Sequence, residues 1–373
     1  MHVQESAPFI HPRYRLLNLL GQGGMGKVYR AFDRLNGQPV ALKQVLVAPQ
    51  DLTFASRPST NDTTGLLMAL AQEFRLLASL RHPHIISVLD YGFDAERQPY
   101  FTMELLDQPQ TLLEAGRNQP LAIQIDLLIQ TLQALTYLHR RGILHGDLKP
   151  DNVLVSQGRV RILDFGLSVT HDQVKSADVS GTLLYMAPEL LEGAAPNEAT
   201  DLYALGVMAY ELLVGRHPFH SDNLGTLLIK VLEADPDLAP LMALTPPNAK
   251  RALPTILLNL LEKQAALRYP SAEAVIADLY ALLGESSPPE NVAIRESFLQ
   301  AATFIGREPE LNRLTTALDQ AVQGQGSAWL IGGESGVGKS RLVDELRTRA
   351  LVTGAMVLRG QAVSRHDRIL DAE

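Results

Sequence analysis

The stretch HGDLKPDN, residues 145–152, places an acid, a lysine and an amide at fixed spacing. It follows the pattern H-R-D-x-x-x-x-N of a loop that catalyses phosphoryl transfer. In such a loop Asp147 accepts the proton of a substrate hydroxyl, Lys149 neutralises charge on the transferred group, and Asn152 holds a second Mg²⁺. The stretch departs from the pattern at one position, where Gly146 replaces the arginine. These residues predict a phosphoryl-transfer site with unusual control.

The composition is that of a globular chain large enough for two domains, or even three. The 373 residues are 46% hydrophobic and 20% charged, with a net charge of −8 and no cysteine. The negative charge, with no run of five basic residues, argues against nucleic acid as the main ligand. The lack of cysteine removes disulfides, thiolate metal sites and cysteine nucleophiles, and fits a reducing compartment.

Neither a targeting segment nor a membrane segment is expected. The N-terminus MHVQESAPFIHPRYRLL lacks a basic segment followed by an apolar core. No uninterrupted apolar run reaches the ~18 residues of a membrane helix. The nearest, residues 202–215, contains Glu211 and is expected to be a buried helix. We therefore expect a cytoplasmic protein that does not bind membranes.

The first part of the chain is predicted to form strands joined by tight turns. Residues 27–33 alternate in strand fashion, the Asn-Gly pair at 36–37 is a strong hairpin signal, and residues 39–45 are predicted to be the returning strand. A further strand pair ends with residues 99–106. Residues 48–65 are predicted to be a mobile loop, and residues 66–80 a helix.

Helical patterns dominate after Pro120. One long helix is marked by apolar residues on a single face: Ile125, Leu128, Ile129, Leu132, Leu135 and Leu138. Further helices are expected at 201–215, 223–233, 252–263 and 271–284. A smaller strand-rich lobe should therefore precede a larger helical lobe.

A glycine-rich loop precedes the strand that carries Lys43. GQGGMGKV (21–28) matches G-x-G-x-x-G-x-V, and its glycines let the backbone close over phosphates. A dinucleotide-binding loop has a similar pattern but leads into a helix, whereas this one leads into a strand. Lys43 in VALK is placed to reach the α- and β-phosphates, with Glu73 as its acidic partner.

The Mg²⁺ ligands are expected from two separate motifs. ILDFGLS supplies Asp164, which would bridge Mg²⁺ to the β- and γ-phosphates, and Asn152 supplies a neutral oxygen. The pair His82 and His84 suggests a metal site at first sight, but no further ligands lie nearby, so a turn after the helix is favoured.

These motifs, in this order, resemble those of eukaryotic-type serine/threonine protein kinases over about residues 13–283. The stretches GQGGMGKVY and HPHI resemble those of bacterial members of this family. The resemblance implies an α+β two-lobed protein kinase fold, with a small β-rich N-lobe (about 13–106) and a larger α-helical C-lobe (about 107–283). It places Met103 at the gatekeeper position and residues 104–106 in the hinge that binds adenine. The implied ATP-binding residues are Leu20, Gly21, Gln22, Gly23, Gly24, Met25, Gly26, Lys27, Val28, Ala41, Lys43, Glu73, Met103, Glu104 and Leu106.

The same resemblance assigns structural roles around the active site. Glu189, in GTLLYMAPE, would pair with Arg268, and Asp201 would brace the catalytic loop. Lys149 and Thr182 favour serine and threonine over tyrosine as acceptors. The activation segment also contains Ser168, Thr170, Ser176 and Ser180. Because Gly146 cannot bind a phosphate on that segment, we expect activity not to depend on its phosphorylation; Lys175 or Arg161 would have to replace the arginine otherwise.

A second unit follows a linker at residues 284–300. GESGVGKS (333–340) matches G-x-x-x-x-G-K-[ST], and the surrounding pattern predicts a buried strand before it and a helix after it. The expected nucleotide contacts are Gly333, Gly336, Gly338, Lys339 and Ser340. FIGREPEL (304–311) resembles the entry of AAA-like signal-transduction ATPases, so residues 301–373 are expected to be the N-terminal part of a P-loop ATPase domain, incomplete at residue 373.

The leading hypothesis is an ATP- and Mg²⁺-dependent kinase that phosphorylates serine and threonine in proteins. One alternative is a catalytically silent kinase-like binding module, supported by Gly146 alone. Another is a nucleotide-dependent signalling switch in which the P-loop unit is the working part. The expected partners are protein substrates, ATP, and a regulatory partner acting through the C-terminal modules.

Overall fold

The computed structural model describes residues 9–11, 13–23, 26–45, 52–53, 80–94, 98–163, 168–169, 183–219, 221, 223–245, 252–285, 307–334, 338–352 and 355. The chain divides into two compact units, Met1–Ala302 and Thr303–Glu373.

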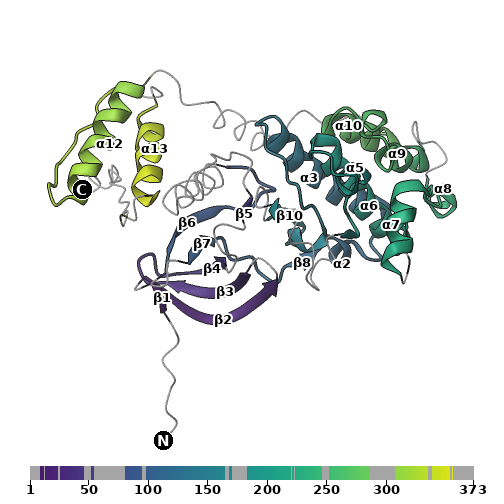
Figure 1. The fold of residues 1–373 in the computed structure, drawn as a ribbon, viewed down its shortest axis with the longest axis horizontal. Helices are drawn as coiled ribbons and strands as arrows, with labels where there is room; N and C mark the ends of the chain where they lie inside the picture. Colours follow the sequence, from purple (N-terminus) through teal and green to yellow (C-terminus); the bar gives the residue numbers. More distant parts are fainter. Residues whose placement is uncertain are drawn as a thin grey trace, which may run out of the picture. The chain divides into compact units, whose positions relative to one another are not determined.

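The first unit begins with a six-stranded antiparallel sheet of order β1-β2-β3-β4-β7-β6 (Figure 1). Its strands are β1 (Phe9–His11), β2 (Tyr14–Gly23), β3 (Gly26–Asp33), β4 (Gln38–Val45), β6 (Val88–Phe93) and β7 (Pro99–Met103). The strands expected at 27–33, 39–45 and 99–106 are present, although β7 ends at Met103. The turn at 34–37 joins β3 to β4, so Val28 lies opposite Lys43.

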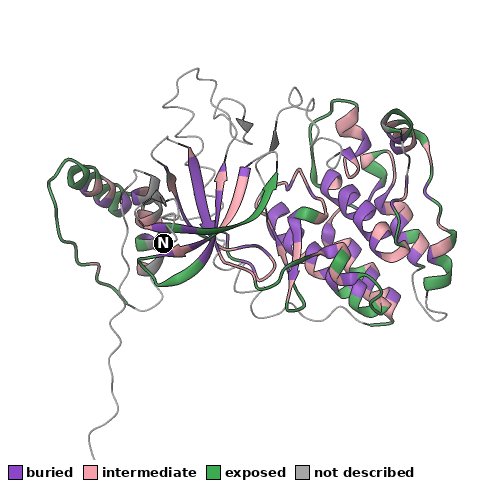
Figure 2. Ribbon diagram, turned by 90° about the horizontal axis from the view of Figure 1, so that it is seen from below, coloured by how far each residue is buried: buried purple, intermediate pink, exposed green. Residues whose placement is uncertain are grey.

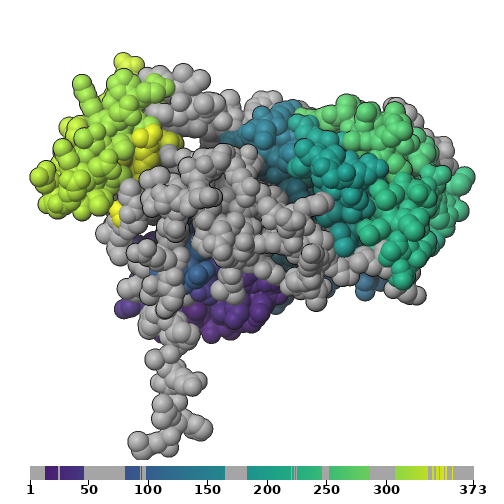
Figure 3. Space-filling model, in the orientation of Figure 1, coloured from purple at the N-terminus to yellow at the C-terminus, as the bar shows by residue number. Residues whose placement is uncertain are grey.

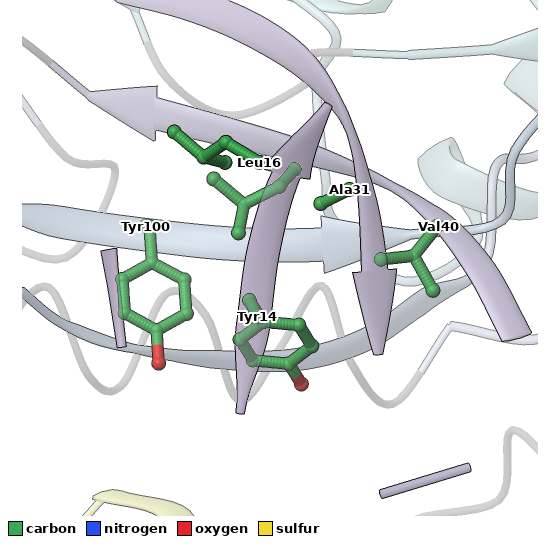
Figure 4. Close-up of a cluster of buried hydrophobic side chains, with 6 residues drawn as sticks. Tyr14, Leu16, Ala31, Val40 and Tyr100 are labelled. Carbon is green, nitrogen blue, oxygen red and sulfur yellow. The ribbon is translucent and has the colours of Figure 1, made fainter. Parts of the chain in front are cut away.

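One face of this sheet carries a small apolar core. Figure 4 shows Tyr14, Leu16, Ala31, Val40 and Tyr100 gathered on it, and Leu42 completes the cluster. The rings of Tyr14 and Tyr100 meet edge to face, with centroids 5.8 Å apart. Residues from four strands thus hold the sheet in one register, which places the glycine-rich turn of β2 and β3 beside β4.

A buried ion network, which the sequence did not reveal, ties the start of β2 to the rest of the sheet. The Arg13 guanidinium donates to both carboxylate oxygens of Asp33, at 2.7 and 2.8 Å, and to Asp90 Oδ2 at 2.5 Å. Tyr14 also donates to Asp90, at 2.9 Å. The partners lie 20 and 77 residues from Arg13, so no local pattern indicates the network.

The helical lobe follows β7 and is built around two buried helices, α3 (Leu121–His139) and α6 (Glu198–Val214). Figure 2 shows buried residues running along the helices of this lobe, and in Figure 3 the lobe is the teal-to-green part of the surface. The other helices are α2 (Leu112–Gly116), α5 (Pro188–Leu191), α7 (Leu224–Glu233), α8 (Ala239–Leu244), α9 (Leu253–Leu260) and α10 (Ala272–Leu283), with 3₁₀ turns η2 (Pro150–Asn152) and η4 (Ala265–Leu267). The helices expected in this region are therefore present.

Helix α3 is long and apolar enough, by length and composition, to cross a membrane. However, 67% of its apolar window is buried inside the lobe, as in the core helix of a folded domain. Leu128, Leu132 and Leu135 lie among its fully buried residues.

A small sheet of order β10-β9-β8 connects the catalytic loop to the first lobe. Its strands are β8 (Gln110–Thr111), β9 (Val153–Ser156) and β10 (Arg159–Ile162). Ile162 forms a bridge with Ile85, and the Ile86 N–H donates to the Ile162 carbonyl at 3.0 Å. Strand β11 (Ser168–Val169) pairs with β5 (Leu52–Thr53), which lies within the stretch predicted to be a loop.

The described part of the second unit contains two helices, α12 (Glu308–Val322) and α13 (Lys339–Val352). Leu311, Leu314 and Leu342 form their common core, against which Ile331 and Leu346 pack. The buried strand predicted over 327–333 is wrong: these residues form no strand, and Leu330 is 98% exposed. The backbone N–H and C=O groups of a strand need a neighbouring strand to pair with. The described residues of this unit contain no strand that could pair with 327–333.

Candidate active site

The catalytic loop brings Asp147, Lys149 and Asn152 together. Lys149 Nζ lies 2.9 Å from Asp147 Oδ2, and Asn152 Nδ2 lies 3.2 Å from the same oxygen. Asn152 also donates to the backbone carbonyl of Asp147 at 2.7 Å. The other carboxylate oxygen, Asp147 Oδ1, is buried and has no hydrogen-bond partner within the described part of the chain. The acceptor capacity of this oxygen is therefore not used by the described residues of the chain.

Asp201, at the start of α6, holds the backbone of this loop. Its Oδ2 accepts from the His145 N–H at 2.9 Å, and its Oδ1 accepts from the Gly146 N–H at 2.9 Å. The imidazole of His139 lies 2.8 Å from Oδ2. Burial alone would raise the pKa of the Asp201 carboxyl, but these hydrogen bonds outweigh it, and the pKa lies below its ordinary value. The carboxylate therefore stays ionised while fully buried.

Gly146 adopts a left-handed backbone conformation, with φ of 75°. A Cβ added there would meet no atom within 4 Å, so only the backbone conformation favours glycine at this position. The departure from the arginine pattern thus leaves Asp147, Lys149 and Asn152 undisturbed.

His145 helps to orient the loop from inside. Its Nε2 lies 3.0 Å from the Leu163 carbonyl, immediately before Asp164 in sequence. Its Nδ1 accepts from the Asp147 N–H at 3.3 Å. A side chain buried to 1% exposure therefore connects the proposed base with the segment that leads to the expected Mg²⁺ ligand.

On the opposite side of the site, Lys43 is buried in β4 at 5% exposure, and its ammonium lies 5.9 Å from the centroid of the Phe101 ring. Gly26 has φ of 144°, and a Cβ there would lie 2.0 Å from the backbone oxygen of Gln44. Only glycine therefore allows β3 to approach β4 so closely at the end of the glycine-rich turn. Leu20, another of the predicted ATP-binding residues, is 49% exposed, whereas Lys43 is buried.

Several predicted site residues lie outside the described residues: Gly24, Met25, Glu73, Asp164, Thr182 and Gly336. The proposed ion pair between Lys43 and Glu73, and the Mg²⁺ role of Asp164, therefore stay predictions.

The hinge follows directly from β7. Met103, buried to 4%, pairs with Ala41 of β4 and with Val88 of β6, and the Glu104 N–H donates to the Ser87 carbonyl at 3.1 Å. Leu105 and Leu106 are partly buried. The backbone of 104–106 thus continues directly from β7, and its role in binding adenine stays a prediction.

Arg161 contacts the hinge side of the molecule. Its Nε donates to Glu104 Oε1 at 2.9 Å, and its Nη1 donates to the Pro83 carbonyl. These contacts hold the guanidinium beside the hinge, where the Glu104 carboxylate already neutralises its charge. These contacts argue against Arg161 as a substitute, in binding an activation-segment phosphate, for the arginine that is absent at position 146.

The segment around Glu189 is fixed by a buried ion pair. Arg268 Nη1 and Nη2 donate to the two carboxylate oxygens of Glu189, each at 2.7 Å, and the Arg268 side chain is completely buried. Burial would raise the pKa of Glu189, but the hydrogen bonds from Arg268 lower it below its ordinary value. Arg268 also donates to the carbonyls of Ala199, Glu262 and Lys263.

A hollow opens beside Asp147 between the catalytic loop, the segment 183–187 and α6. Its lining combines apolar residues with the polar side chains of Asp147, Thr200 and Asp201: Gly146, Asp147, Leu148, Tyr185, Met186, Ala187, Leu190, Thr200, Asp201 and Ala204. We call it the acceptor hollow, because the proposed base lies in its wall. Sequence analysis did not identify Tyr185 or Met186 as site residues.

Asn152 offers an oxygen that suits a divalent cation. Both of its hydrogen bonds use the amide nitrogen, which leaves the neutral oxygen Oδ1 for a hard cation such as Mg²⁺. Among the described residues there is no group of three His, Asp or Glu side chains that would hold a metal on their own. The oxygen of Asn152 therefore suits a shared role in holding Mg²⁺, whereas the role of Asp164, outside the described residues, stays a prediction.

The P-loop of the second unit is described at both ends. Lys339 Nζ donates to the carbonyls of Gly333 and Glu334, at 2.6 and 2.5 Å. Gly338 has φ of 88°, and Lys339 and Ser340 open α13. The lysine side chain therefore contacts the backbone at the start of the loop, and its role toward nucleotide phosphates stays a prediction.

The comparisons with known proteins agree with this geometry. The protein kinase domain family matches residues 14–280, and the AAA ATPase domain family matches residues 303–371. Among the curated relatives, the serine/threonine-protein kinase PknA of Mycobacterium tuberculosis is 36% identical over 279 residues, which cover 71% of this chain and 61% of the relative. The DNA damage-responsive serine/threonine-protein kinase RqkA of Deinococcus radiodurans is 38% identical over 280 residues, which cover 72% of this chain and 39% of the relative.

A solved structure supports the fold directly. The kinase domain of M. tuberculosis PknI aligns with a TM-score of 0.54 and 25% identity, covering 76% of this chain and 100% of that one. The chain spans about 40 to 60% of the length of the two curated relatives named above. The family match, the catalytic loop and the two-lobed fold agree. This chain therefore belongs to the protein kinase family, and its kinase domain is followed by an AAA ATPase domain.

Proposed function

We propose that the chain transfers the γ-phosphoryl group of ATP to serine and threonine hydroxyls of proteins, as part of cytoplasmic signal transduction. The observation that carries this proposal is how the two carboxylate oxygens of Asp147 are hydrogen-bonded. Lys149 and Asn152 hold one of its carboxylate oxygens, and the other, buried oxygen lacks a partner within the described part of the chain.

In the proposed step the acceptor hydroxyl donates a hydrogen bond to Asp147 and attacks the γ-phosphorus. The bond between that phosphorus and the bridging oxygen of ADP breaks, and the hydroxyl proton passes to Asp147. Lys149, whose Nζ lies 2.9 Å from Asp147, stabilises the negative charge of the transferred group. Mg²⁺, when bound, neutralises charge on the phosphate oxygens.

The two lobes supply the remaining parts. We assign Lys43 to the α- and β-phosphates, and the backbone of 104–106 to the adenine. Asp201 keeps the catalytic loop in place through the backbone N–H groups of His145 and Gly146. Preorganised groups of this kind account for most of the acceleration of phosphoryl transfer, because the reaction needs positioning more than covalent help.

Asp147→Asn tests the assignment. A general base contributes roughly 10²- to 10⁴-fold to the rate, so phosphorylation of a generic protein acceptor should fall by about that factor, while ATP binding is retained. Undiminished turnover by the purified variant would remove Asp147 from the mechanism.

The AAA ATPase unit is proposed to be a second, independent nucleotide-binding module through which a partner regulates the kinase. Lys339→Ala should leave phosphorylation of an acceptor protein unchanged, whereas Lys43→Ala should abolish it. If Lys339→Ala silenced the kinase, the alternative of a nucleotide-dependent switch driven by the P-loop would be supported instead.

A further inference from the structure

His217 is a buried histidine outside the residues assigned above. It lies in GRHPF, directly after α6, and is 7% exposed. Its Nε2 lies 2.8 Å from the carbonyl oxygen of Leu184, and its Nδ1 accepts from the backbone N–H of Phe219 at 3.1 Å. A carbonyl can only accept and an amide N–H can only donate, so the neutral ring must carry its proton on Nε2. Both partners therefore fix the orientation of the imidazole.

The Leu184 carbonyl belongs to the segment that forms one wall of the acceptor hollow. The next two residues, Tyr185 and Met186, line the hollow together with Asp147. The Tyr185 hydroxyl donates to Glu211 Oε2 at 2.8 Å, and its ring meets the His217 ring edge to face, with centroids 6.0 Å apart. Burial and the bond to Glu211 raise the pKa of the Tyr185 phenol, so it stays protonated and keeps donating.

The two ends of segment 183–187 are held without His217. The Met186 N–H donates to the Leu183 carbonyl at 3.4 Å, and the Ala187 carbonyl accepts from the N–H groups of Leu190 and Leu191 at 3.0 and 3.4 Å. The Leu184 carbonyl, between them, is held by His217. His217 and Glu211 thus hold it from the side of α6, one through the backbone and one through a side chain.

We propose that His217 is a positioning residue for the protein acceptor: by holding the Leu184 carbonyl, it keeps Tyr185 and Met186 where the acceptor segment binds beside Asp147. The inference rests on the proposed function, since it concerns the acceptor side of the same site. It assigns no contact between His217 and the substrate, and none with ATP.

A purely local role makes a different prediction. If His217 served only to hold the loop 217–219, its bond to the Phe219 N–H would matter and its bond to Leu184 would not. The two nitrogens can be replaced separately. His217→Asn keeps an acceptor near the position of Nδ1 but cannot reach Leu184. His217→Gln keeps an N–H donor near the position of Nε2 but loses the local acceptor.

The experiment compares both variants with wild-type full-length chain, using dephosphorylated casein as the acceptor. KM and kcat are measured separately for casein and for ATP, and the dissociation constant of casein is measured in parallel. A net hydrogen bond contributes about 0.5–1.5 kcal/mol, which corresponds to roughly two- to twelvefold in binding. We expect His217→Asn to raise the KM and dissociation constant for casein by about three- to tenfold, with KM for ATP unchanged, and His217→Gln to stay within twofold.

Arg216→Ala is the matched control. Arg216 precedes His217 but pairs with Asp237 at the surface, where both side chains are more than half exposed. It should leave all constants unchanged. Thermal unfolding of each variant checks that the kinase domain remains folded. If His217→Asn does not fold, His217→Gln tests the proposal: a rise of more than twofold in the KM for casein, with Arg216→Ala unchanged, would overturn it.

Equal effects of the Asn and Gln variants on casein, or wild-type constants in His217→Asn, would overturn the proposal. A change in KM for ATP as large as that for casein would do so as well. Failure of the proposed function looks different: wild type would bind casein without phosphorylating it, or Asp147→Asn would retain full turnover, and the casein dissociation constants would still test His217.

Discussion

Replacement of Gly146 by alanine separates backbone strain from catalysis. Gly146 has φ of 75°, and a Cβ there would meet no atom within 4 Å, so alanine introduces no steric clash with the surroundings. The left-handed conformation costs an L-residue roughly 1–2 kcal/mol. Asparagine tolerates this conformation better, so Gly146→Asn should cost less than Gly146→Ala.

The loop has two ways to respond to alanine. It can keep its conformation and accept the strain, or it can rotate and break the bond from the Gly146 N–H to Asp201. That bond is 2.9 Å long and ends on a carboxylate that is 2% exposed, and hydrogen bonds to charged groups contribute about 1.5–3 kcal/mol. Because breaking the bond costs more than the strain, the loop should keep its conformation. We therefore expect the free energy of unfolding of the kinase domain to fall by about 1–2 kcal/mol, with kcat within threefold of wild type.

Urea unfolding and steady-state kinetics of the full-length chain measure the two quantities. Gly158→Ala is the matched control, because Gly158 has φ of 72° and an equally open Cβ position, but lies in the turn between β9 and β10. It should lose similar stability and no activity. The reasoning is refuted if Gly146→Ala unfolds at the same urea concentration as wild type, or if its kcat falls more than tenfold while Gly158→Ala is fully active.

Three further predictions concern stability and control. Burial, with smaller contributions from neighbouring charges, lowers the pKa of His82 to about 3 and that of His84 to about 4; the unfolded chain therefore binds more protons below pH 6.5, and stability should fall by about 2 kcal/mol per histidine between pH 6.5 and pH 5. His82→Asn, which cannot titrate, should flatten that pH dependence in urea unfolding, and an unchanged slope would contradict the assignment. Arg268→Ala leaves the Glu189 carboxylate without its buried partner and should cost about 3–5 kcal/mol, against at most about 1 kcal/mol for Arg216→Ala at the surface; similar thermal shifts for both would argue against the pair. Finally, phosphatase treatment should change kinase activity less than tenfold, since Gly146 offers no guanidinium to an activation-segment phosphate, and a larger drop would show that another basic residue has taken that role.

Much of the kinase domain follows from local sequence. The strand around Lys43, the Asn-Gly turn at 36–37 and the helix over 121–139 each reflect the backbone geometry of a single element, and all are present in the structure. The identities of Asp147, Lys149 and Asn152 follow from chemistry at fixed spacing within one loop, and so does their proximity. The absence of an arginine at position 146 is likewise visible in the sequence, and with it the expectation of unusual control.

Tertiary structure alone decided which distant groups meet. The strand expected at 327–333 depends on neighbours that pair with its backbone, and without them among the described residues it does not form. From the sequence, Arg161 was a candidate to replace the arginine missing at position 146, but in the structure β10 places it beside Glu104, 57 positions away. His217 gave no sequence signal, because its partner Leu184 lies 33 positions earlier and offers only a backbone carbonyl, which every residue possesses. Local spacing therefore determines elements and loop chemistry, whereas contacts to buried backbone groups far along the chain depend on how the elements pack.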